Sequence, residues 1–496
     1  MKKGAFRFPM IKVDGGGGES PDPAVFCPAN GYIPNPVSID DGWVLLAEFY
    51  NLSPAISTFD PTMFVNSGQY AWDLGDGSII IGTLSISHQY LTTEIRTTKL
   101  YGKGVCSIRS IDFRSDNIYG ELDLTNEAFS ALEIIYLNLM PQTTQVYFPS
   151  ICTGVVSYLY LGSGITGVLN IEMFATFGTS AYLNLLQNAQ MTGVVFGPSI
   201  SGTFAELVVS ACNITGAFDL SMFSSFTSSG KFDIGGNPNL TSIIFAESIS
   251  GSFAYLGFNT LGISGVLDLR VFTSLNTAGI IYVNSNPNVT SVLFAPSMTG
   301  FLGTMYASST GIVGVLDMTM FTVHTATANL RFELNPTLTG INFASSVTGS
   351  LSTLYIYSTG IAGVLNLSMF TSYAATATLF LYSNPQLTGV LFSATAITGF
   401  VRTLRLYSNT NLGYVDFTKL KTGTSSLNWD MKSNGWSAAI VNRILVDIDS
   451  ISASGFTGRS INIGGTNADP DSSSGGYNGV VARTSLIVKG FTVTIT

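Results

Sequence analysis

Residues 379–384 read LFLYSN, and residues 404–409 read LRLYSN, 25 positions further along the chain. In both stretches leucine occupies the first and third positions, whereas the second and fourth positions carry aromatic or charged residues. Alternation of this kind predicts a short β-strand with one buried face. Because the strand recurs at a fixed spacing, the sequence predicts a stack of similar coils.

A longer period of 49 residues organises the middle of the chain. Five segments such as GVLDLRVF begin 49 positions apart, and one phenylalanine and one asparagine per unit follow the same spacing. Since the strand pattern recurs halfway through each unit, a unit comprises two coils of 24 or 25 residues. Extending this register toward the N-terminus predicts strands near Ile134, Tyr158 and Leu183. The three series are Gly167, Gly216, Gly265, Gly314 and Gly363; Phe196, Phe245, Phe294, Phe343 and Phe392; and Asn188, Asn237, Asn286, Asn335 and Asn384.

A polar residue lies five positions after the first leucine of most strands. In a stacked solenoid, a buried Asn, Cys or Thr at this position can hydrogen-bond the free backbone groups of the turn and of the next coil. The pattern L-x-L-x-x-N/C-x-L resembles a leucine-rich repeat over about residues 105–435. The resemblance implies a mainly β fold, a leucine-rich-repeat-like parallel β-solenoid, with short strands, turns or 3₁₀ segments on its convex side. The expected structural polar ladder is Asn188, Asn237, Asn286, Asn335, Asn384 and Asn409.

Residues 36–104 are expected to form a small β domain before the solenoid. Residues 72–78 read WDLGDGS, and residues 88–90 read HQY. These motifs resemble those of PKD-like β-sandwich modules, which also precede leucine-rich repeats in some Bacteroidetes surface proteins. The resemblance implies a structural role, with Asp and Gly in a tight turn and the aromatic residues in the core. A calcium site at Asp73 and Asp76 is the alternative.

Two further regions complete the predicted organisation. Residues 1–35, rich in Gly and Pro, are expected to form a flexible or anchoring arm. Residues 436–496 are expected to form an α/β cap over the last layer of the solenoid, with helices at 437–451 and 479–489 and a final strand. This last region resembles the C-terminal end of leucine-rich tail and appendage proteins from phages of Bacteroidetes.

Composition excludes several classes of partner. The formal net charge of -9 and the lack of a basic cluster argue against nucleic acid. No run reaches the roughly 18 apolar residues of a membrane span, so no membrane insertion is expected. The four cysteines show no metal-ligand or redox spacing, and we expect buried thiols rather than a metal site or a cofactor. They are Cys27, Cys106, Cys152 and Cys212.

The chain is predicted not to be an enzyme. Its two histidines, His88 and His324, have no evident ligand cluster near them in sequence, and no nucleotide-binding or hydrolase motif is present. Glycosidase chemistry needs two carboxylates about 5 to 10 Å apart, which leaves a polysaccharide-degrading enzyme as an alternative. Repeated acidic residues on the convex side favour a turn role instead: Asp219, Asp268 and Asp317, replaced by Asn170 and Asn366 in other units.

Aromatic and arginine residues gather at outward strand positions in the C-terminal half of the solenoid, whereas earlier coils carry residues such as Ser210 and Gly257. Tyrosine provides a rigid surface with a polar tip, suited to stacking on sugars or anchoring a protein interface. The alternative is a ladder that only stabilises the sheet. The predicted binding residues are Tyr282, Tyr306, Arg331, Tyr355, Tyr357, Phe380, Tyr382, Arg405 and Tyr407.

These features favour a protein that presents a surface. We expect a phage virion structural protein, a tail-fibre-like or capsid-decorating appendage, whose N-terminal arm docks on other virion proteins and whose solenoid binds a host surface glycan or protein. The N-terminal MKKGAFRFPMIKVDGGGG shows no export signal, in keeping with assembly in the cytoplasm. The alternatives are a bacterial cell-surface leucine-rich-repeat adhesin and a purely structural virion component. A homo-oligomer is compatible with each.

Overall fold

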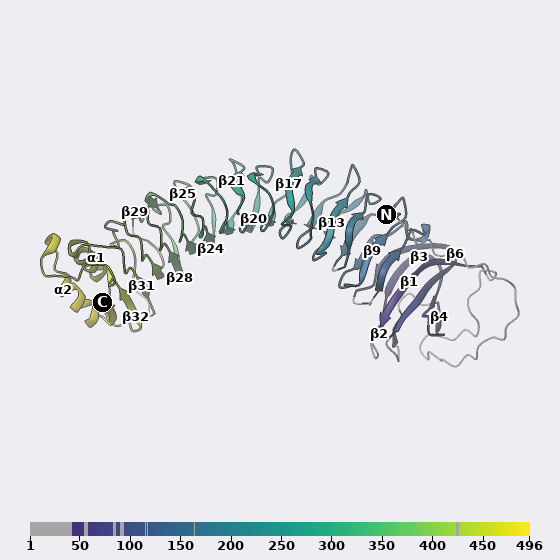
Figure 1. Cartoon of the computed structure of the whole chain (residues 1–496), viewed down its shortest axis with the longest axis horizontal. Helices are drawn as coiled ribbons and strands as arrows, with labels where there is room; N and C mark the ends of the chain where they lie inside the picture. The colour runs from purple at the N-terminus through teal and green to yellow at the C-terminus, as the bar shows by residue number, and fades with distance from the viewer. Residues whose placement is uncertain are drawn as a thin grey trace.

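The computed structural model describes residues 42–53, 58–82, 86–89, 94–114, 116, 118–162, 164–395, 397–422 and 426–496. They form a curved parallel β-solenoid of about 13 turns, with one sheet along the concave side and short strand pairs along the convex side (Figure 1). The prediction of a mainly β solenoid is confirmed. The predicted arm, Cys27 and Tyr90 lie outside the described residues.

Each coil contributes one strand to the concave sheet, and neighbouring strands run parallel. After the shared strand β6 (Glu94–Asp112), the order follows the chain. The strands are β8 (Ile134–Leu137), β10 (Val156–Leu161), β12 (Phe177–Asn184), β14 (Phe204–Val208), β16 (Phe226–Asp233), β18 (Phe253–Gly257), β20 (Leu275–Tyr282), β22 (Leu302–Tyr306), β24 (His324–Arg331), β26 (Leu351–Tyr355), β28 (Tyr373–Phe380), β30 (Val401–Arg405), β31 (Asn428–Asp430), β32 (Arg459–Asn462) and β33 (Phe491–Thr494).

One apolar residue per coil forms a continuous buried row beneath this sheet. The predicted inward residues Leu354, Leu379 and Leu404 belong to it and are fully buried. Toward the N-terminus, the prediction is confirmed at Leu183 but is one residue early at Ile134 and Tyr158, because Ile135 and Leu159 occupy the row. The row comprises Ile111, Ile135, Leu159, Leu183, Leu207, Phe232, Leu256, Ile281, Met305, Leu330, Leu354, Leu379, Leu404, Trp429, Ile461 and Val493.

Short parallel strand pairs lie on the convex side, one per 49-residue unit. At the second-last position of its strand, the carboxylate of Asp219, Asp268 or Asp317 accepts a hydrogen bond from the backbone N–H two residues later, at 2.9 to 3.0 Å. This local turn explains why asparagine replaces aspartate in other units. The pairs are β7 (Ile118–Asp123) with β9 (Thr143–Tyr147), β11 (Thr166–Asn170) with β13 (Gln190–Val195), β15 (Gly216–Leu220) with β17 (Leu240–Phe245), β19 (Gly265–Leu269) with β21 (Val289–Phe294), β23 (Gly314–Met318) with β25 (Leu338–Phe343), and β27 (Gly363–Asn366) with β29 (Leu387–Leu391).

Buried asparagines join successive coils at the turn that follows the concave strand. Asn335 donates from Nδ2 to the carbonyl oxygens of Ala307 and Phe332, at 2.7 and 2.8 Å. Its Oδ1 accepts from the backbone N–H and the hydroxyl of Thr310. Each such side chain therefore satisfies backbone groups of two coils, which would otherwise be buried without partners. The other members with two main-chain carbonyl acceptors are Asn188, Asn237, Asn286, Asn384, Asn409, Asn434 and Asn467.

The N-terminal part is an antiparallel sheet that continues directly into the solenoid. It comprises β1 (Trp43–Ser53), β3 (Thr62–Asp73), β4 (Ile79–Ile81) and β6, and a separate pair joins β2 (Thr58–Phe59) to β5 (His88–Gln89). The strand β6 pairs antiparallel with β1 and β3 and parallel with β8. The predicted boundary between residues 104 and 105 thus falls inside one strand.

Aromatic packing forms the core of this N-terminal part. Trp72 is buried and meets Phe49, Phe59 and Phe113 edge-on, with ring centroids 6.0 to 6.4 Å apart. In the turn after Trp72, the carboxylate of Asp76 pairs with Nε2 of His88 at 2.7 Å, and this partner helps to lower the pKa of Asp76 to about 2 against the opposing effect of burial. Both carboxylate oxygens of Asp76 and Oδ1 of Asp73 have protein partners, because the backbone N–H groups of Ser78 and Gly75 donate to Oδ1 of Asp76 and of Asp73.

Two helices close the C-terminal end, as the sequence predicts. They are α1 (Ala438–Ile451) and α2 (Gly479–Val488), inserted between the last strands of the concave sheet. Short 3₁₀ segments lie at η2 (Glu127–Phe129) and η3 (Ser474–Gly476). Apolar residues of both helices join the same continuous core as the coils: Val441, Ile444, Leu445 and Ile448 from α1, and Ala482 and Leu486 from α2.

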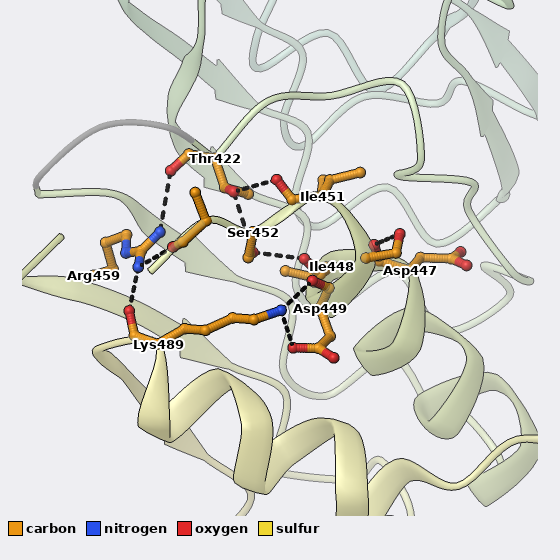
Figure 2. A network of polar contacts seen from close by, with 10 residues as sticks. Thr422, Asp447, Ile448, Asp449, Ile451, Ser452, Arg459 and Lys489 are labelled. Carbon is orange, nitrogen blue, oxygen red and sulfur yellow. Dashed lines mark hydrogen bonds and ion pairs between the residues drawn. The ribbon is translucent and has the colours of Figure 1, made fainter. Parts of the chain in front are cut away.

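A buried arginine ties the cap together (Figure 2). Arg459, only 1% exposed, donates to the carbonyl oxygens of Thr422, Ala453 and Lys489. The ammonium group of Lys489 in turn donates to the backbone and side-chain oxygens of Asp449, at 2.7 and 2.8 Å. Because Arg459 is the first residue of β32, this network links the last coils to both helices.

Candidate binding surface on the concave sheet

The outward positions of the concave sheet place six predicted binding residues in one row. Strand pairing puts them side by side on six neighbouring coils, from β20 to β30. We call this set the central row; it comprises Tyr282, Tyr306, Arg331, Tyr355, Phe380 and Arg405.

The central row is an unbroken stack of rings and guanidinium groups. Arg331 lies between two tyrosine rings, whereas Arg405 covers the last ring of the row. Ring planes deviate by only 15° between Tyr282 and Tyr306 and by 6° between Tyr355 and Phe380. Ring-centre or guanidinium-to-ring distances along the row are 4.8 Å for Tyr282–Tyr306, 5.0 Å for Tyr306–Arg331, 4.6 Å for Arg331–Tyr355, 4.4 Å for Tyr355–Phe380 and 4.7 Å for Phe380–Arg405.

A second stack runs beside the first at the turn that follows each strand. Tyr357, Tyr382 and Tyr407 stack with ring centroids 4.5 Å apart, and the ammonium group of Lys432 lies 5.7 Å from the last ring. Together with the central row, these three tyrosines form what we call the tyrosine stripe. The structure thus brings together all nine predicted binding residues on one surface.

Stacking decides which part of each ring a ligand can reach. The rings inside the two stacks have a neighbour over each face, so the stacks leave only their edges uncovered. The stacking of sugars on ring faces that the sequence suggests is therefore blocked for these rings. The tyrosine side chains are half-buried for the same reason. The hydroxyl group of Tyr306 accepts a hydrogen bond from Nδ2 of Asn329 at 2.8 Å. The stripe consequently offers hydroxyl groups and ring edges in a fixed arrangement.

The cationic side chains in and beside the tyrosine stripe differ in whether a carboxylate lies near them. Arg331 Nε lies 3.7 Å from a carboxylate oxygen of Glu333, whose pKa is raised by burial. Lys432 Nζ lies 3.8 Å from Asp430. Arg405 is exposed and forms no ion pair with a described residue, since its register neighbour Asp430 lies closest to Lys432. Arg405 is therefore the cation of the stripe that is most available to an external anion.

Burial raises the pKa of three phenol groups of the stripe. It raises the pKa of Tyr382 to about 12, and it also raises the pKa of Tyr282 and of Tyr357. At neutral pH these hydroxyl groups therefore serve as hydrogen-bond donors as well as acceptors.

A second aromatic group on the same sheet escaped the sequence prediction. Tyr158 and Tyr182 stack 4.9 Å apart, and Tyr136 and Tyr160 stack 5.3 Å apart. The guanidinium of Arg114 lies 4.5 Å above the ring of Tyr136. We call the four tyrosines the N-terminal tyrosine cluster. Correct register would have revealed it, because the strand pattern near Tyr158, shifted by one residue, directs these side chains outward.

Smaller and charged residues separate the two aromatic groups. Glu206 lies 4.0 Å from the ammonium group of Lys231, and burial raises the pKa of the neighbouring Asp233. Glycine at 257 leaves room for the carboxylate of Asp233, since a Cβ there would lie 2.4 Å from its Oδ1. The middle of the concave face therefore carries charged and small residues, together with Tyr255, whose ring packs edge-on against Tyr282 with centroids 5.3 Å apart.

The titratable side chains that could bind a metal ion and the cysteines do not form a second site within the described residues. Among the residues that the structure describes, no three His, Cys, Asp or Glu side chains are placed to hold a metal ion. Cys212 is buried at the polar-ladder position, with its thiol 3.1 Å from the carbonyl oxygen of Leu185, whereas Cys106 and Cys152 are only partly buried. Burial raises the pKa of Cys152 to about 12.

No helix within the described ranges is both long and apolar enough to cross a membrane.

No protein-family model, curated protein or solved structure matches this chain.

Proposed function

We propose that this chain is a binding protein whose tyrosine stripe contacts a macromolecule on a cell surface. The observation that supports this most directly is the unbroken stack of six side chains along neighbouring coils. Side chains held in this way lose little conformational entropy when a ligand binds, which favours affinity. Extended aromatic and arginine surfaces are also typical of energetically important contacts.

The wider role that we propose is that of a phage virion appendage, either tail-fibre-like or capsid-decorating. A curved solenoid with one broad concave face (Figure 1) is suited to projecting a binding surface away from a particle. In this role, other virion proteins hold the N-terminal end, and a host glycan or protein contacts the solenoid. A purely structural virion component is the second candidate, and it predicts that a neighbouring subunit covers the stripe.

A triple substitution of the stripe tests the binding role. Tyr355→Ala/Tyr357→Ala/Tyr382→Ala removes three half-buried rings from both stacks, and we expect binding to host cells or to a glycan array to fall by at least about tenfold. Circular dichroism establishes first that the variant is folded. The matched control, Val315→Ala/Val364→Ala, removes exposed side chains from the convex side and should bind like the wild type.

The outcome separates the two candidates. Loss of binding in the folded triple variant alone supports a receptor-binding surface. If wild-type protein binds no cell and no glycan, while particles that carry the triple variant fail to assemble, the structural role replaces the binding role.

A further inference from the structure

The tyrosine stripe presents hydrogen-bond donors and partial positive charge to its surroundings. Tyr306, Tyr355 and Phe380 each have neighbours over both faces at 4.4 to 5.0 Å. Only their edges remain for a ligand, and the edge of an aromatic ring carries partial positive charge. Electron-rich oxygen atoms are the natural partners of such a surface.

Two arginines reinforce this polarity. Arg331 is held between two rings, and its buried Nε lies 3.7 Å from Glu333, so the terminal N–H groups of its planar group remain for a ligand. Arg405 has the ring of Phe380 on one side and Asp430 of β31 as its register neighbour on the other, and it forms no ion pair with a described residue. Guanidinium groups bind carboxylate, sulfate and phosphate groups through paired N–H donors. The spacing of the two arginines, three coils apart in the central row, sets two anion positions along the stripe.

A row of small polar side chains borders the central row. Strand pairing places Thr304, Asn329, Thr353, Thr378 and Thr403 side by side, two residues before the central-row residue of each strand. None of these residues is fully buried. Asn329 already donates from Nδ2 to the hydroxyl of Tyr306 at 2.8 Å. The four threonine hydroxyls are therefore the groups of this row that can exchange hydrogen bonds with a polyhydroxylated ligand.

We propose that the tyrosine stripe binds a linear acidic polysaccharide. Its anionic groups contact Arg331 and Arg405, and its hydroxyl groups contact the tyrosine hydroxyls and the threonine row. The six-coil row is about 24 Å long at the usual spacing of parallel strands, which fits an extended chain better than a single sugar. This inference rests on the proposed function and names the ligand class of the same surface.

The net negative charge of the chain opposes the approach of an acidic polymer, so binding depends on local contacts. The chain carries a formal net charge of -9, which repels a polyanion at a distance. Binding of an acidic polymer must therefore come from cations and donors arranged at one place. Removal of one such cation is accordingly a sensitive test.

The test compares two polymers on the full chain: polygalacturonate, which is acidic, and dextran, which is neutral. Titration calorimetry or surface binding should show that polygalacturonate binds and that dextran does not. Arg405→Gln should weaken polygalacturonate binding about tenfold, the order expected for loss of one charge-assisted hydrogen bond. Arg405→Lys, which keeps the charge but not the planar stack, should fall between Arg405→Gln and the wild type.

Arg270→Gln is the matched control. Arg270 is an exposed arginine of the convex side, paired with Asp268 at 2.6 Å, so its loss should leave the affinity unchanged. Equal loss in both variants overturns the inference, because it indicates a general effect of charge. Thermal unfolding of each variant shows that the fold is retained.

Further outcomes distinguish this inference from the proposed function. If dextran binds as well as polygalacturonate and the tyrosine triple variant abolishes both, the surface binds glycans but the acidic ligand class is wrong. If host cells bind through the stripe and neither polymer does, the inference also fails while the proposed function stands. If neither cells nor polymers bind, both fail.

Discussion

At the scale of single residues, the repeats place unusual side chains in positions that are apolar in neighbouring units. His324 begins strand β24 where Phe226 and Leu275 begin the equivalent strands of earlier units. It is 3% exposed, and its Nδ1 has no hydrogen-bond partner within the described part of the chain. Burial lowers its pKa from 6.5 to about 4. The folded protein therefore holds a neutral imidazole that becomes protonated in the unfolded chain at mildly acidic pH.

This histidine predicts a specific pH dependence. Because the pKa is lower in the folded state, protonation favours the unfolded state as pH falls from about 6.5 toward 4. His324→Leu, which copies the residue at the same position one unit earlier, should remove this loss. Relative to its value at pH 7.5, the stability difference between variant and wild type should shift by about 2 kcal/mol in favour of the variant at pH 5. Urea unfolding at several pH values measures the difference in unfolding free energy between the variant and the wild type. If this difference does not depend on pH, the lowered pKa of His324 is wrong.

At the scale of elements, the concave strands were predicted correctly where they recur at the spacing found in the C-terminal half. The predicted register is wrong where that spacing changes. Leu354, Leu379 and Leu404 lie 25 or 49 residues from their counterparts, so the sequence alone identifies the buried row and the stripe above it. The first coils instead repeat every 24 residues, from Ile111 to Leu207. Alternating 24 and 25 backward therefore lands one residue early. Such a slip exchanges the two faces of a strand, which is why the N-terminal tyrosine cluster was missed.

Other features depend on three-dimensional contacts that no spacing contains. Whether tyrosine rings bind ligands by face or by edge depends on the 4.4 to 5.0 Å contacts between coils. The network around Arg459 joins segments from Thr422 to Lys489, in coils that have lengthened to accommodate helices. The sequence predicted those helices from their apolar spacing, but not the buried cation between them.

Glycines in the turns provide a matched pair of substitutions. Gly300 and Gly314 both have positive φ, +90° and +80°. A Cβ on Gly300 would lie 1.8 Å from the carbonyl oxygen of Leu275, whereas one on Gly314 would have no described atom within 4 Å. Gly314→Ala should therefore cost only the backbone strain, about 1 kcal/mol, and Gly300→Ala several times as much. Urea unfolding and hydrogen exchange around residues 275–302 measure the difference. Equal costs would mean that the coils separate easily at this turn.

At the scale of the whole molecule, stability is the sum of contacts between successive coils. A single continuous core runs from the N-terminal sheet to the cap, and each coil packs mainly on its two neighbours. In such arrays, unfolding of one part need not unfold the rest, so removal of an internal unit is tolerated when the ends still match. The chain offers equivalent ends at Gly216 and Gly265.

Deletion of residues 216–264 tests this equivalence. It removes one 49-residue unit and joins Thr215 to Gly265, so the new coil contacts repeat existing ones. The shortened protein should fold, with its sheet about 10 Å shorter by small-angle scattering. The comparison deletion of residues 240–264 removes one coil and eliminates β17, the convex partner of β15, and should be clearly less stable. Equal stability of the two would show that the single coil is the unit of assembly.

The strand β6 belongs both to the N-terminal sheet and to the concave sheet of the solenoid, and it therefore joins the two parts rigidly. It pairs with β1 and β3 in the N-terminal sheet, and its last three residues pair with β8 in the first coil of the solenoid. Bending the solenoid relative to the N-terminal sheet would break these hydrogen bonds together, because the same strand runs through both parts. The concave face of the solenoid therefore keeps one orientation relative to the N-terminal sheet. Several copies mounted alike would then act as an ordered array, all engaging a surface from the same side.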